Sequence, residues 1–339
     1  MYNISCFLII LIPLLFSVRK KEDGFVIKNK KAEKIREFRI VENDTLSYTL
    51  NLKLDDSGRP QYFFRNIFTP VCYTNECKPV YINFYWDLLG NYERYDLPEG
   101  KVLTKIDHDE FKSEDYEKLQ DILSKQNSIF ADLEMEDLIT KGTDDLSDSV
   151  DAKTGATLKT IKNEVIDGAV YTCFTLWKIA YGKAVPEMLK ITESYKNDQL
   201  LHFFLADKNY HYQYWAMEKV IQKNGNISKS FEQDIEKIIE GKNHFTARTA
   251  LQKTGNEFFL QSQKQNWLWK VFQSTSYPMQ IAILKKLKTI PLNQTLTEKI
   301  ADDVAKSNEE QRKLKIEVLK SQPKLSAKSQ KILDAAVDD

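Results

Sequence analysis

The sequence has no excess of charge of either sign. Its 339 residues include 49 Lys and Arg and 49 Asp and Glu, so the formal net charge is +0 at pH 7. No basic arm or stripe stands out, and such a feature is the electrostatic signature of proteins that bind nucleic acid. We therefore expect no nucleic-acid partner. With 42% hydrophobic and 29% charged residues, the composition is that of a globular protein, and the length allows about two domains.

Histidine and cysteine are also scarce, with four of each. Metal sites and nucleophilic triads need His or Cys grouped with carboxylates or hydroxyls, and the sequence offers no such grouping. We therefore predict no metal site and no triad. Whether the chain is an enzyme with a substrate of its own stays open.

The apolar run at residues 6–18 is too short for a comfortable membrane span of about 20 residues. Its length is typical of the core of a signal peptide, so we predict export to the periplasm or cell envelope. No Lys or Arg precedes the run, and Arg19, Lys20 and Lys21 follow it. An uncleaved anchor through residues 6–18 therefore remains the alternative. Cys6 stands before the run, which does not fit a lipid-modified cysteine.

Five stretches alternate polar and apolar residues, which predicts strands. They are residues 37–42, 46–54, 61–68, 81–86 and 92–97. The segment Asp-Asp-Ser-Gly-Arg-Pro at 55–60 is a strong turn signal between the second and third strands. A helix is expected at 113–125, where Ser113 and two following acidic residues favour a helix start.

A long amphipathic helix is expected from about residue 158 to Gly182, because apolar residues recur there every three or four positions. Residues 150–157, Val-Asp-Ala-Lys-Thr-Gly-Ala-Thr, stand directly before it. Thr157 would then lie in the first helical turn, where unpaired N–H groups and the helix dipole favour a phosphate. Gly155 and Ala156 keep the approach to that hydroxyl free of bulk. The simpler interpretation is an ordinary capped helix start.

The pattern Asp-x-x-Thr-Gly-Ala-Thr at residues 151–157 resembles the flavinylation motif, Asp-x-x-(Ser/Thr)-Gly-Ala-(Ser/Thr), of the FMN-binding domain family. That family includes the covalent-flavin subunits of sodium-pumping and related membrane-bound respiratory complexes. The resemblance implies that Thr157 carries FMN through a phosphoester made by a separate flavin transferase. It also implies that Asp151 fixes the turn or is recognised by the transferase, and that Thr154 replaces the commoner Ser. The resemblance covers about residues 70–182.

The same resemblance implies that a segment containing His and Thr approaches the flavin. Thr104 and His108 are loose matches to that segment. The alternative is a solvated loop with local Asx hydrogen bonds. Tyr171, Phe174 and Trp177 could touch an isoalloxazine ring, although aromatic residues at helical spacing more often belong to a core.

Cys72 and Cys77 are five residues apart, immediately before the fourth predicted strand. In an exported protein such a pair is most simply a local disulfide that closes a loop. A redox-active pair that exchanges electrons with a nearby flavin is the alternative. Cys173 stands alone on the apolar face of the predicted helix, so we expect a buried, inert thiol.

From residue 183 onward, strand signals vanish and helical patterns repeat. Four similar segments, 214–219, 248–253, 280–285 and 315–320, recur with a period of roughly 32–35 residues. This period resembles that of HEAT-like helical hairpin repeats. An irregular helical bundle is the alternative. His202, His211 and His244 lie among aromatic residues here and are expected to be packing or surface residues.

The predicted fold class is α+β followed by all-α. A signal peptide or anchor at 1–18 and a flexible segment at 19–35 precede an α+β, flavin-binding-like domain with an antiparallel sheet at 36–182, and a HEAT-like helical domain occupies 183–339. Two functions follow. One is an extracytoplasmic flavoprotein with FMN on Thr157, matured by a flavin transferase, whose helical repeats dock a redox or membrane protein partner. The other is a non-redox binding or scaffold protein.

Overall fold

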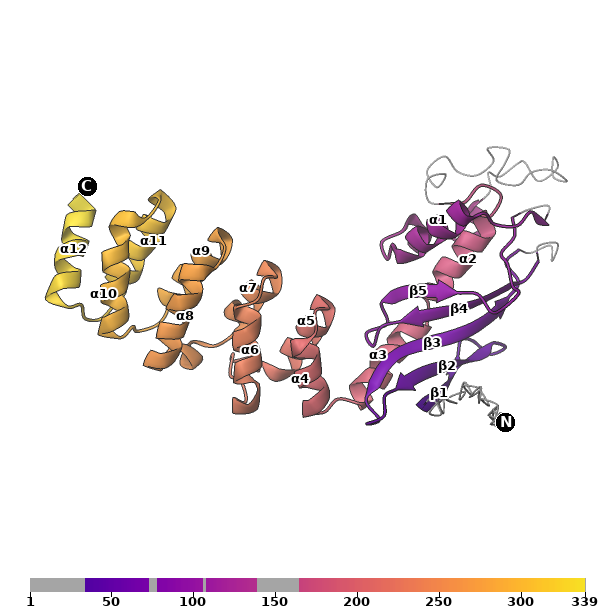
Figure 1. Cartoon of the computed structure of the whole chain (residues 1–339), viewed down its shortest axis with the longest axis horizontal. Helices are drawn as coiled ribbons and strands as arrows, with labels where there is room; N and C mark the ends of the chain where they lie inside the picture. The colour runs from indigo at the N-terminus through magenta and orange to yellow at the C-terminus, as the bar shows by residue number, and fades with distance from the viewer. Residues whose placement is uncertain (1–33, 73–77, 106–107, 139–164, 339) are drawn as a thin grey trace, which may run out of the picture. The chain divides into compact units, whose positions relative to one another are not determined.

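The computed structural model describes residues 34–72, 78–105, 108–138 and 165–338 (Figure 1). Residues Lys34–Asp339 belong to one compact unit. The predicted signal segment at 1–18 lies outside the described residues, as does nearly all of the segment at 19–35. None of the helices in the described ranges is long and apolar enough to cross a membrane.

The first part of this unit is a five-stranded antiparallel sheet in which neighbours in sequence pair in the order β1-β2-β3-β4-β5. The strands are β1 (Lys34–Val41), β2 (Ser47–Leu54), β3 (Pro60–Thr69), β4 (Val80–Trp86) and β5 (Tyr92–Asp96). Every predicted strand is therefore present. The predicted fold class, α+β followed by all-α, is confirmed as well, because the named elements that follow β5 in the described residues are all helices.

One face of the sheet carries the core, because successive side chains of a strand point to opposite faces. Leu50, Leu52, Phe63, Phe84 and Trp86 point to this face and are completely buried. The rings of Phe84 and Trp86 meet edge to face, with centroids 5.7 Å apart. Large aromatic side chains bury the most apolar area, so they supply much of the free energy that holds this layer.

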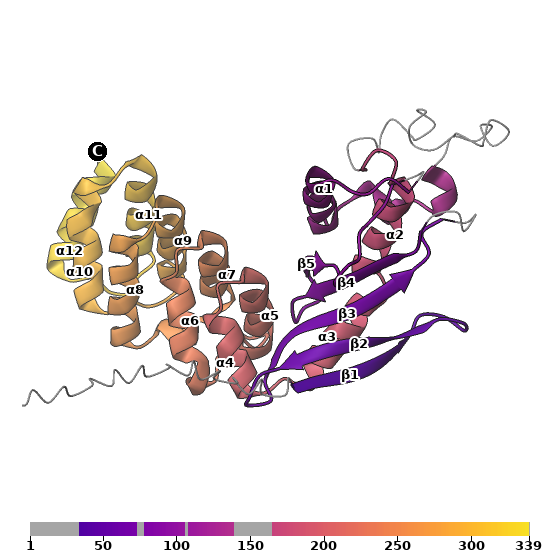
Figure 2. The ribbon, with the colours of Figure 1, turned by 45° about the vertical axis from the view of Figure 1, so that its right-hand side comes forward.

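Three helices cover that face (Figures 1 and 2). They are α1 (Ser113–Ser124), α2 (Val170–Ala180) and α3 (Ala184–Ser194). The indole Nε1 of Trp86 donates a hydrogen bond to the carbonyl of Ala180 at 2.8 Å. The hydroxyl of Thr192 donates to the carbonyl of Leu88 at 2.5 Å. These buried bonds attach α2 and α3 to the end of β4, and α1 packs along β5.

The helix after the flavinylation-like motif is shorter than the sequence indicated. We expected one helix from about 158 to 182, but residues 165–169 form a bend and a turn, and α2 begins at Val170. Gly168 has a φ of 75°, a left-handed conformation that interrupts a helix. Cys173, Leu176 and Ala180, which the apolar periodicity indicated, are completely buried, and other residues of α2 are buried with them. Thr157 therefore does not lie in the first turn of α2.

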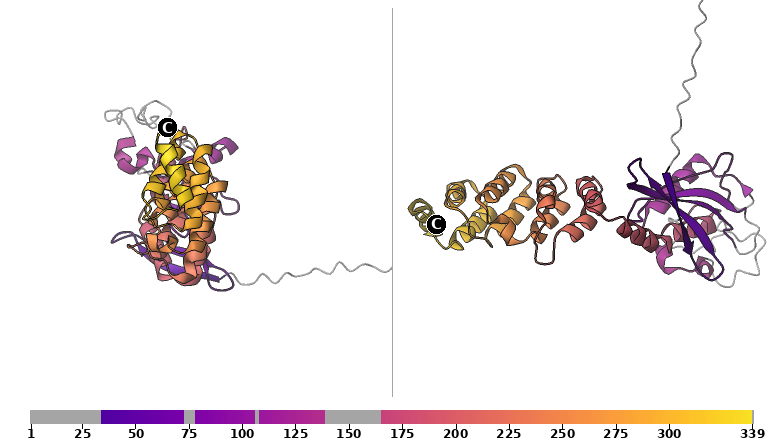
Figure 3. Two further views of the ribbon diagram at one scale, coloured as in Figure 1. Left: turned by 90° about the vertical axis from the view of Figure 1, so that its left-hand side faces the viewer. Right: turned by 90° about the horizontal axis from the view of Figure 1, so that it is seen from below.

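The remaining elements form the helical stack, α4 to α12, which Figures 1 and 3 show as successive helix pairs. Its helices are α4 (Asp198–Ala206), α5 (Tyr210–Val220), α6 (Glu232–Ile239), α7 (His244–Lys253), α8 (Ser262–Ser274), α9 (Tyr277–Leu287), α10 (Gln294–Asp303), α11 (Glu309–Lys320) and α12 (Ala327–Asp338).

Asparagine residues begin many of these helices. The side chains of Asn197, Asn209, Asn243, Asn293 and Asn308 each accept a hydrogen bond from a backbone N–H in the first turn. Such a cap satisfies a donor that the helix cannot pair, and losing it costs about 1 kcal/mol. The repeated caps fix where each helix starts.

The helices of the stack pack in two rows. In one row α5, α7, α9 and α11 contact one another in turn, and in the other row α4 contacts α6 while α10 contacts α8 and α12. Each pair therefore packs mainly against the next pair along the chain. This arrangement is that of a repeat protein and not of an irregular bundle.

Hydrogen bonds between pairs repeat the sequence period. Lys286 donates to the Thr254 carbonyl, 32 residues away, and Gln322 donates to the Ile290 carbonyl, also 32 residues away. Asn256 donates to the Thr289 carbonyl at a separation of 33 residues. Because the same spacing joins each pair to the next, the period found in the sequence is the repeat of the structure.

Two glycines allow neighbouring loops to touch. The N–H of Gly255 donates to the carbonyl of Gly225 at 2.8 Å, and Gly225 has a φ of 84°. A Cβ atom on Gly225 would lie 2.4 Å from the nitrogen of Gly255. Only glycine fits this approach.

The turn between β4 and β5 joins the sheet region, β1–β5 with α1 to α3, to the helical stack. The N–H of Leu88 donates to the hydroxyl of Tyr212 on α5 at 2.9 Å, and Asn209 donates to the carboxylate of Asp87 at 3.1 Å. The carbonyl of Leu88 accepts from Thr192. The domain boundary at 182/183 stays a prediction. Because Thr192 ties α3 to Leu88, these contacts favour a boundary that lies after α3.

Candidate functional site

The residues of the flavinylation-like motif lie outside the described part of the chain. Asp151, Thr154, Gly155, Ala156 and Thr157 all fall between residues 138 and 165. Their arrangement therefore stays a prediction. The structure describes the segments of the chain on either side of them, which end at Leu138 and begin again at Val165.

Both of these flanking segments pack against α2. Before the motif, Leu138 ends the short helix η3 (Met135–Leu138) and is buried. After it, Val165 and Ile166 are buried, and the N–H of Ile166 donates to Sγ of Cys173 on α2 at 3.5 Å. The helix η3 also contacts α2. The chain is therefore anchored to α2 on both sides of the motif.

The aromatic residues of α2 form part of the core. Phe130 meets Phe174 edge to face at 5.6 Å between centroids, and it lies 6.1 Å from Trp177. The indole N–H of Trp177 donates to the carbonyl of Lys125 at 2.8 Å. Phe174 and Trp177 are both buried, whereas Tyr171 is half-buried. The core interpretation of Phe174 and Trp177 is confirmed.

Thr104 and His108 lie on one loop but are held differently. Thr104 pairs with Glu110 as an antiparallel bridge, and the N–H of Lys105 donates to the carbonyl of Asp109 at 2.7 Å. His108 is exposed and has a φ of 66°, a left-handed conformation that is uncommon outside glycine. A role for either residue at a flavin stays a prediction.

The same loop is tied to the start of α1 by a buried carboxylate. Asp115 pairs with Nζ of Lys105 at 2.8 Å and accepts from the N–H of Lys112 at 2.8 Å. Burial opposes ionisation of Asp115, but the hydrogen bonds from Lys105 and Lys112 outweigh it and lower the pKa of this carboxyl. Asp115 is therefore an anion that fixes the loop, and it is not available as a general acid.

The cysteines follow the expectation where they are described. Cys72 is disulfide-bonded. Cys77, its predicted partner, lies outside the described residues, so this pairing stays a prediction. Cys173 is free and completely buried, as expected, and burial raises the pKa of its thiol to about 12. At neutral pH this thiol is uncharged and has no nucleophilic role.

The structure contains a groove that the sequence did not reveal. It lies between α7 and α9, encloses about 580 Å³, and is lined by Arg248, Tyr277, Ile281 and Lys285 among other residues. The repeat pattern held a signal for it, because Arg248 begins one repeated segment and Lys285 ends the next. That signal marked helix centres and did not say which side chains face a neighbouring helix.

Comparison with known proteins adds no relative, because no family model, no curated protein and no solved structure matches the chain. The resemblances to the FMN-binding domain family and to HEAT-like repeats therefore rest on the residues and stay predictions. Within the described ranges, no group of three or more His, Cys, Asp or Glu side chains could hold a metal ion.

Proposed function

We propose that this chain is an extracytoplasmic flavoprotein that carries FMN covalently on Thr157, acts in electron transfer, and uses the helical stack to dock a partner. The observation that carries the proposal is the motif at 151–157, in which an acceptor hydroxyl follows Asp151, Thr154, Gly155 and Ala156 at the required spacing. The partners are a flavin transferase for maturation and a redox or membrane protein for electron exchange.

The chemistry of these residues fits a phosphoester. The hydroxyl oxygen of Thr157 would attack the flavin-bearing phosphorus of a flavin dinucleotide, the nucleoside monophosphate would leave, and the hydroxyl proton would depart with it. The side chain then holds FMN through one new P–O bond. Lys153 and Lys159 are close enough in sequence to pair with the phosphate, and each charge-assisted hydrogen bond contributes about 1.5–3 kcal/mol.

The start of α2 at Val170 removes one argument for the site and leaves others. Thr157 is not a residue of the first turn of α2, so in this proposal phosphate binding rests on the lysines and on the local backbone. The anchoring of Leu138 and Ile166 on α2 supports the proposal, because a covalent carrier needs its attachment segment tied to a folded support.

Mass spectrometry tests the flavin. Co-expressed with a flavin transferase, the wild-type protein should gain the mass of FMN less one water. Thr157→Ala should abolish this gain, whereas Thr160→Ala, a matched hydroxyl outside the motif, should retain it. Asp151→Ala should reduce it if the transferase recognises that carboxylate. An unmodified wild-type protein, in cells where a known acceptor domain is flavinylated, would refute the proposal.

Export is part of the proposal, and the cysteines test it. An oxidising compartment keeps disulfides intact, and Cys72 is disulfide-bonded. In a Cys6→Ser background, non-reduced protein unfolded in denaturant should alkylate at Cys173 alone. Alkylation at Cys72 and Cys77 as well would contradict both the bridge and the oxidising compartment.

The second candidate function is a non-redox scaffold, which the groove between α7 and α9 favours. In that case residues 151–157 form an ordinary loop or capped helix start, and the helical stack alone does the binding. Yellow colour that survives denaturation separates the two functions, because only a covalent flavin stays with the unfolded chain.

A further inference from the structure

The groove between α7 and α9 has an apolar floor. Leu251 of α7 and Ile281, Ala282 and Pro278 of α9 line it, and Tyr277 forms one wall. Tyr277 is 41% exposed, and its hydroxyl hydrogen-bonds the carboxylate of Glu310 at the start of α11. An exposed aromatic ring beside apolar side chains is typical of a contact surface.

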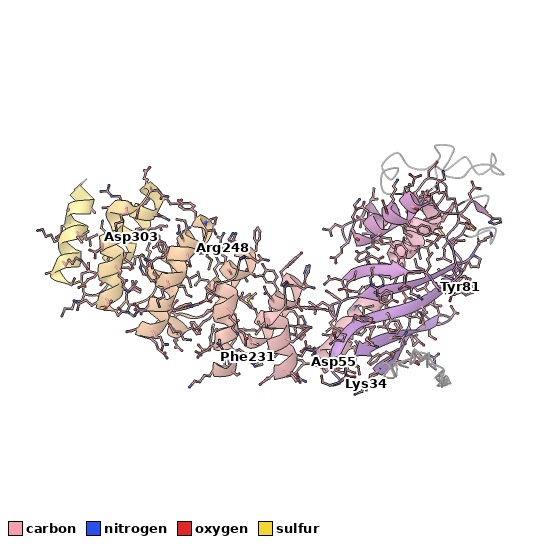
Figure 4. All side chains as sticks on the ribbon, in the orientation of Figure 1. Lys34, Asp55, Tyr81, Phe231, Arg248 and Asp303 are labelled. Atoms are coloured by element: carbon pink, nitrogen blue, oxygen red, sulfur yellow. The ribbon has the colours of Figure 1, made fainter. Side chains whose placement is uncertain are left out.

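Basic side chains surround this floor. Arg248, labelled in Figure 4, is exposed and has no hydrogen bond or ion pair within the part of the chain that the structure describes. Lys285 is exposed and lies close enough to Glu317 on α11 to influence it. The groove is therefore rimmed by cations that are not neutralised by direct ion pairs.

Lys286 adds a cation that is half-buried. Its Nζ donates to the carbonyl of Thr254 at 2.5 Å and lies 5.2 Å from the centroid of the Phe259 ring. Burial lowers the pKa of this ammonium group. The Thr254 carbonyl and the Phe259 ring interact favourably with the ammonium group of Lys286 but leave its positive charge in place. An anion that entered the groove would therefore stabilise the charged form of Lys286.

We propose that this groove binds a short acidic segment of a partner protein, in which Asp or Glu side chains flank an apolar side chain. The carboxylates would pair with Arg248 and Lys285, and the apolar side chain would cover Ile281. Glu310 is the one acidic group among the described residues that line the groove, and its carboxylate accepts a hydrogen bond from Tyr277. A small anion would satisfy the cations but leave the apolar floor exposed, so the combination favours a peptide.

This inference deepens the docking role proposed for the helical stack and does not depend on flavin. It names the part of the stack that makes contact and the chemistry of the contact. The protein that supplies the acidic segment belongs to the class of redox or membrane partners already proposed.

Fluorescence anisotropy of a labelled peptide tests the groove. The probe is fluorescein-Gly-Asp-Leu-Glu-Leu-Asp-Gly, titrated with the full chain, and binding should weaken as salt rises. Arg248→Gln combined with Lys285→Gln should raise Kd by about tenfold or more. Both side chains are exposed, so the far-ultraviolet circular dichroism should not change. Ile281→Ser, without any change in charge, should also weaken binding.

The matched control carries the same change in net charge on the other row of helices. Lys270→Gln combined with Lys299→Gln, on α8 and α10, should leave Kd unchanged. The proposal is overturned if the wild type does not bind the probe, if the control loses as much affinity as the groove variant, or if a probe with Asn and Gln in place of Asp and Glu binds equally well.

Two further measurements test what the groove recognises and whether it acts independently of flavin. Inorganic phosphate, added at constant ionic strength, should displace the probe poorly, and displacement at concentrations similar to those of the peptide would mean a small-anion site. Thr157→Ala should bind the probe as the wild type does. A failed flavin proposal is therefore detected by mass, and a failed groove proposal is detected by anisotropy.

Discussion

The sheet region and the helical stack are held together across different distances in sequence. In the sheet region, the bond from Trp86 to Ala180 spans 94 residues and the bond from Thr192 to Leu88 spans 104. In the stack, bonds between successive pairs span much shorter separations, from 26 residues between Gln265 and Pro291 to 33 residues between Asn256 and Thr289. Long-range contacts make a region fold as one unit, whereas stacked repeats depend mainly on their neighbours.

This difference suits the two proposed roles. An attached redox group needs a support that does not open locally, and the segments around residues 151–157 are anchored on α2, which packs in the sheet region. A docking surface can be built from units that each add a local binding feature, which is the role we propose for the groove between α7 and α9. The same contrast predicts how far the loss of one buried side chain spreads through each region.

The largest effect is expected for Trp86→Ala. Trp86 is completely buried, and the substitution removes both the ring contact with Phe84 and the hydrogen bond to the carbonyl of Ala180. A substitution of this kind costs about 3–5 kcal/mol. Because the contacts are long-range, amide hydrogen exchange should accelerate in all five strands and in α2 together. Faster exchange confined to β4 would contradict the idea of one cooperative unit.

A matched tryptophan in the stack sharpens the comparison. Trp269 on α8 is 3% exposed and stacks on Phe272 at 4.5 Å between ring centroids. Trp269→Ala removes a side chain of the same size, but exchange should accelerate only in α8 and the helices next to it. The helices α4 and α5 should keep their protection. Loss of protection throughout the stack would mean that it also folds as one unit.

The fold could be predicted from the sequence where periodicity decides the structure. The alternating pattern of Leu50, Leu52 and the other core residues fixed which face of each strand is buried, and the strands followed. The period of about 32 residues likewise located the repeats. The single continuous helix expected from about 158 to 182 was wrong, because the left-handed Gly168 interrupts it, and the hydrophobic periodicity of the sequence gives no sign of that break.

The candidate sites were predictable in part. A single sequence does not show which residues far apart along the chain lie in contact. The hydrogen bond that the N–H of Leu88 donates to the hydroxyl of Tyr212 was therefore not foreseen. The groove at Arg248 was missed for the same reason, since it forms only when two helices 30 or so residues apart are packed together. The motif at 151–157 is a chemical signal that needs no fold to be noticed, but it lies outside the described residues.

Removing the hydroxyl of Tyr212 should loosen the junction between the two regions. Tyr212→Phe leaves the buried N–H of Leu88 without its partner, which costs about 1–3 kcal/mol. Tyr214→Phe, on the same helix, removes a hydroxyl with no hydrogen bond to the described residues and should change stability little. Urea unfolding followed by circular dichroism compares the two variants. Equal stabilities would mean that the bond at Leu88 contributes nothing.

The smallest effect is expected at the turn between β2 and β3, where Asp55 is labelled in Figure 4. The hydroxyl of Ser57 donates to its carboxylate at 2.6 Å, and the N–H groups of Ser57 and Arg59 add further bonds. The Ser57 hydrogen bond is the largest influence. Together with the backbone bonds and the charge of Arg59, it outweighs the opposing effect of burial and lowers the pKa of Asp55 to about 2.

A lowered pKa means that the ionised form stabilises the fold. Because the folded pKa of about 2 lies below the unfolded value of about 3.9, this contribution is complete above about pH 5 and is lost progressively as the pH falls through 4 toward 2. Asp55→Asn should therefore melt at a lower temperature than the wild type at pH 5, and the difference should shrink as the pH approaches 2. Asp44→Asn, in the turn between β1 and β2, is the matched control. A constant difference between wild type and Asp55→Asn from pH 5 to pH 2 would show that the side chain acts through its shape and not through its charge.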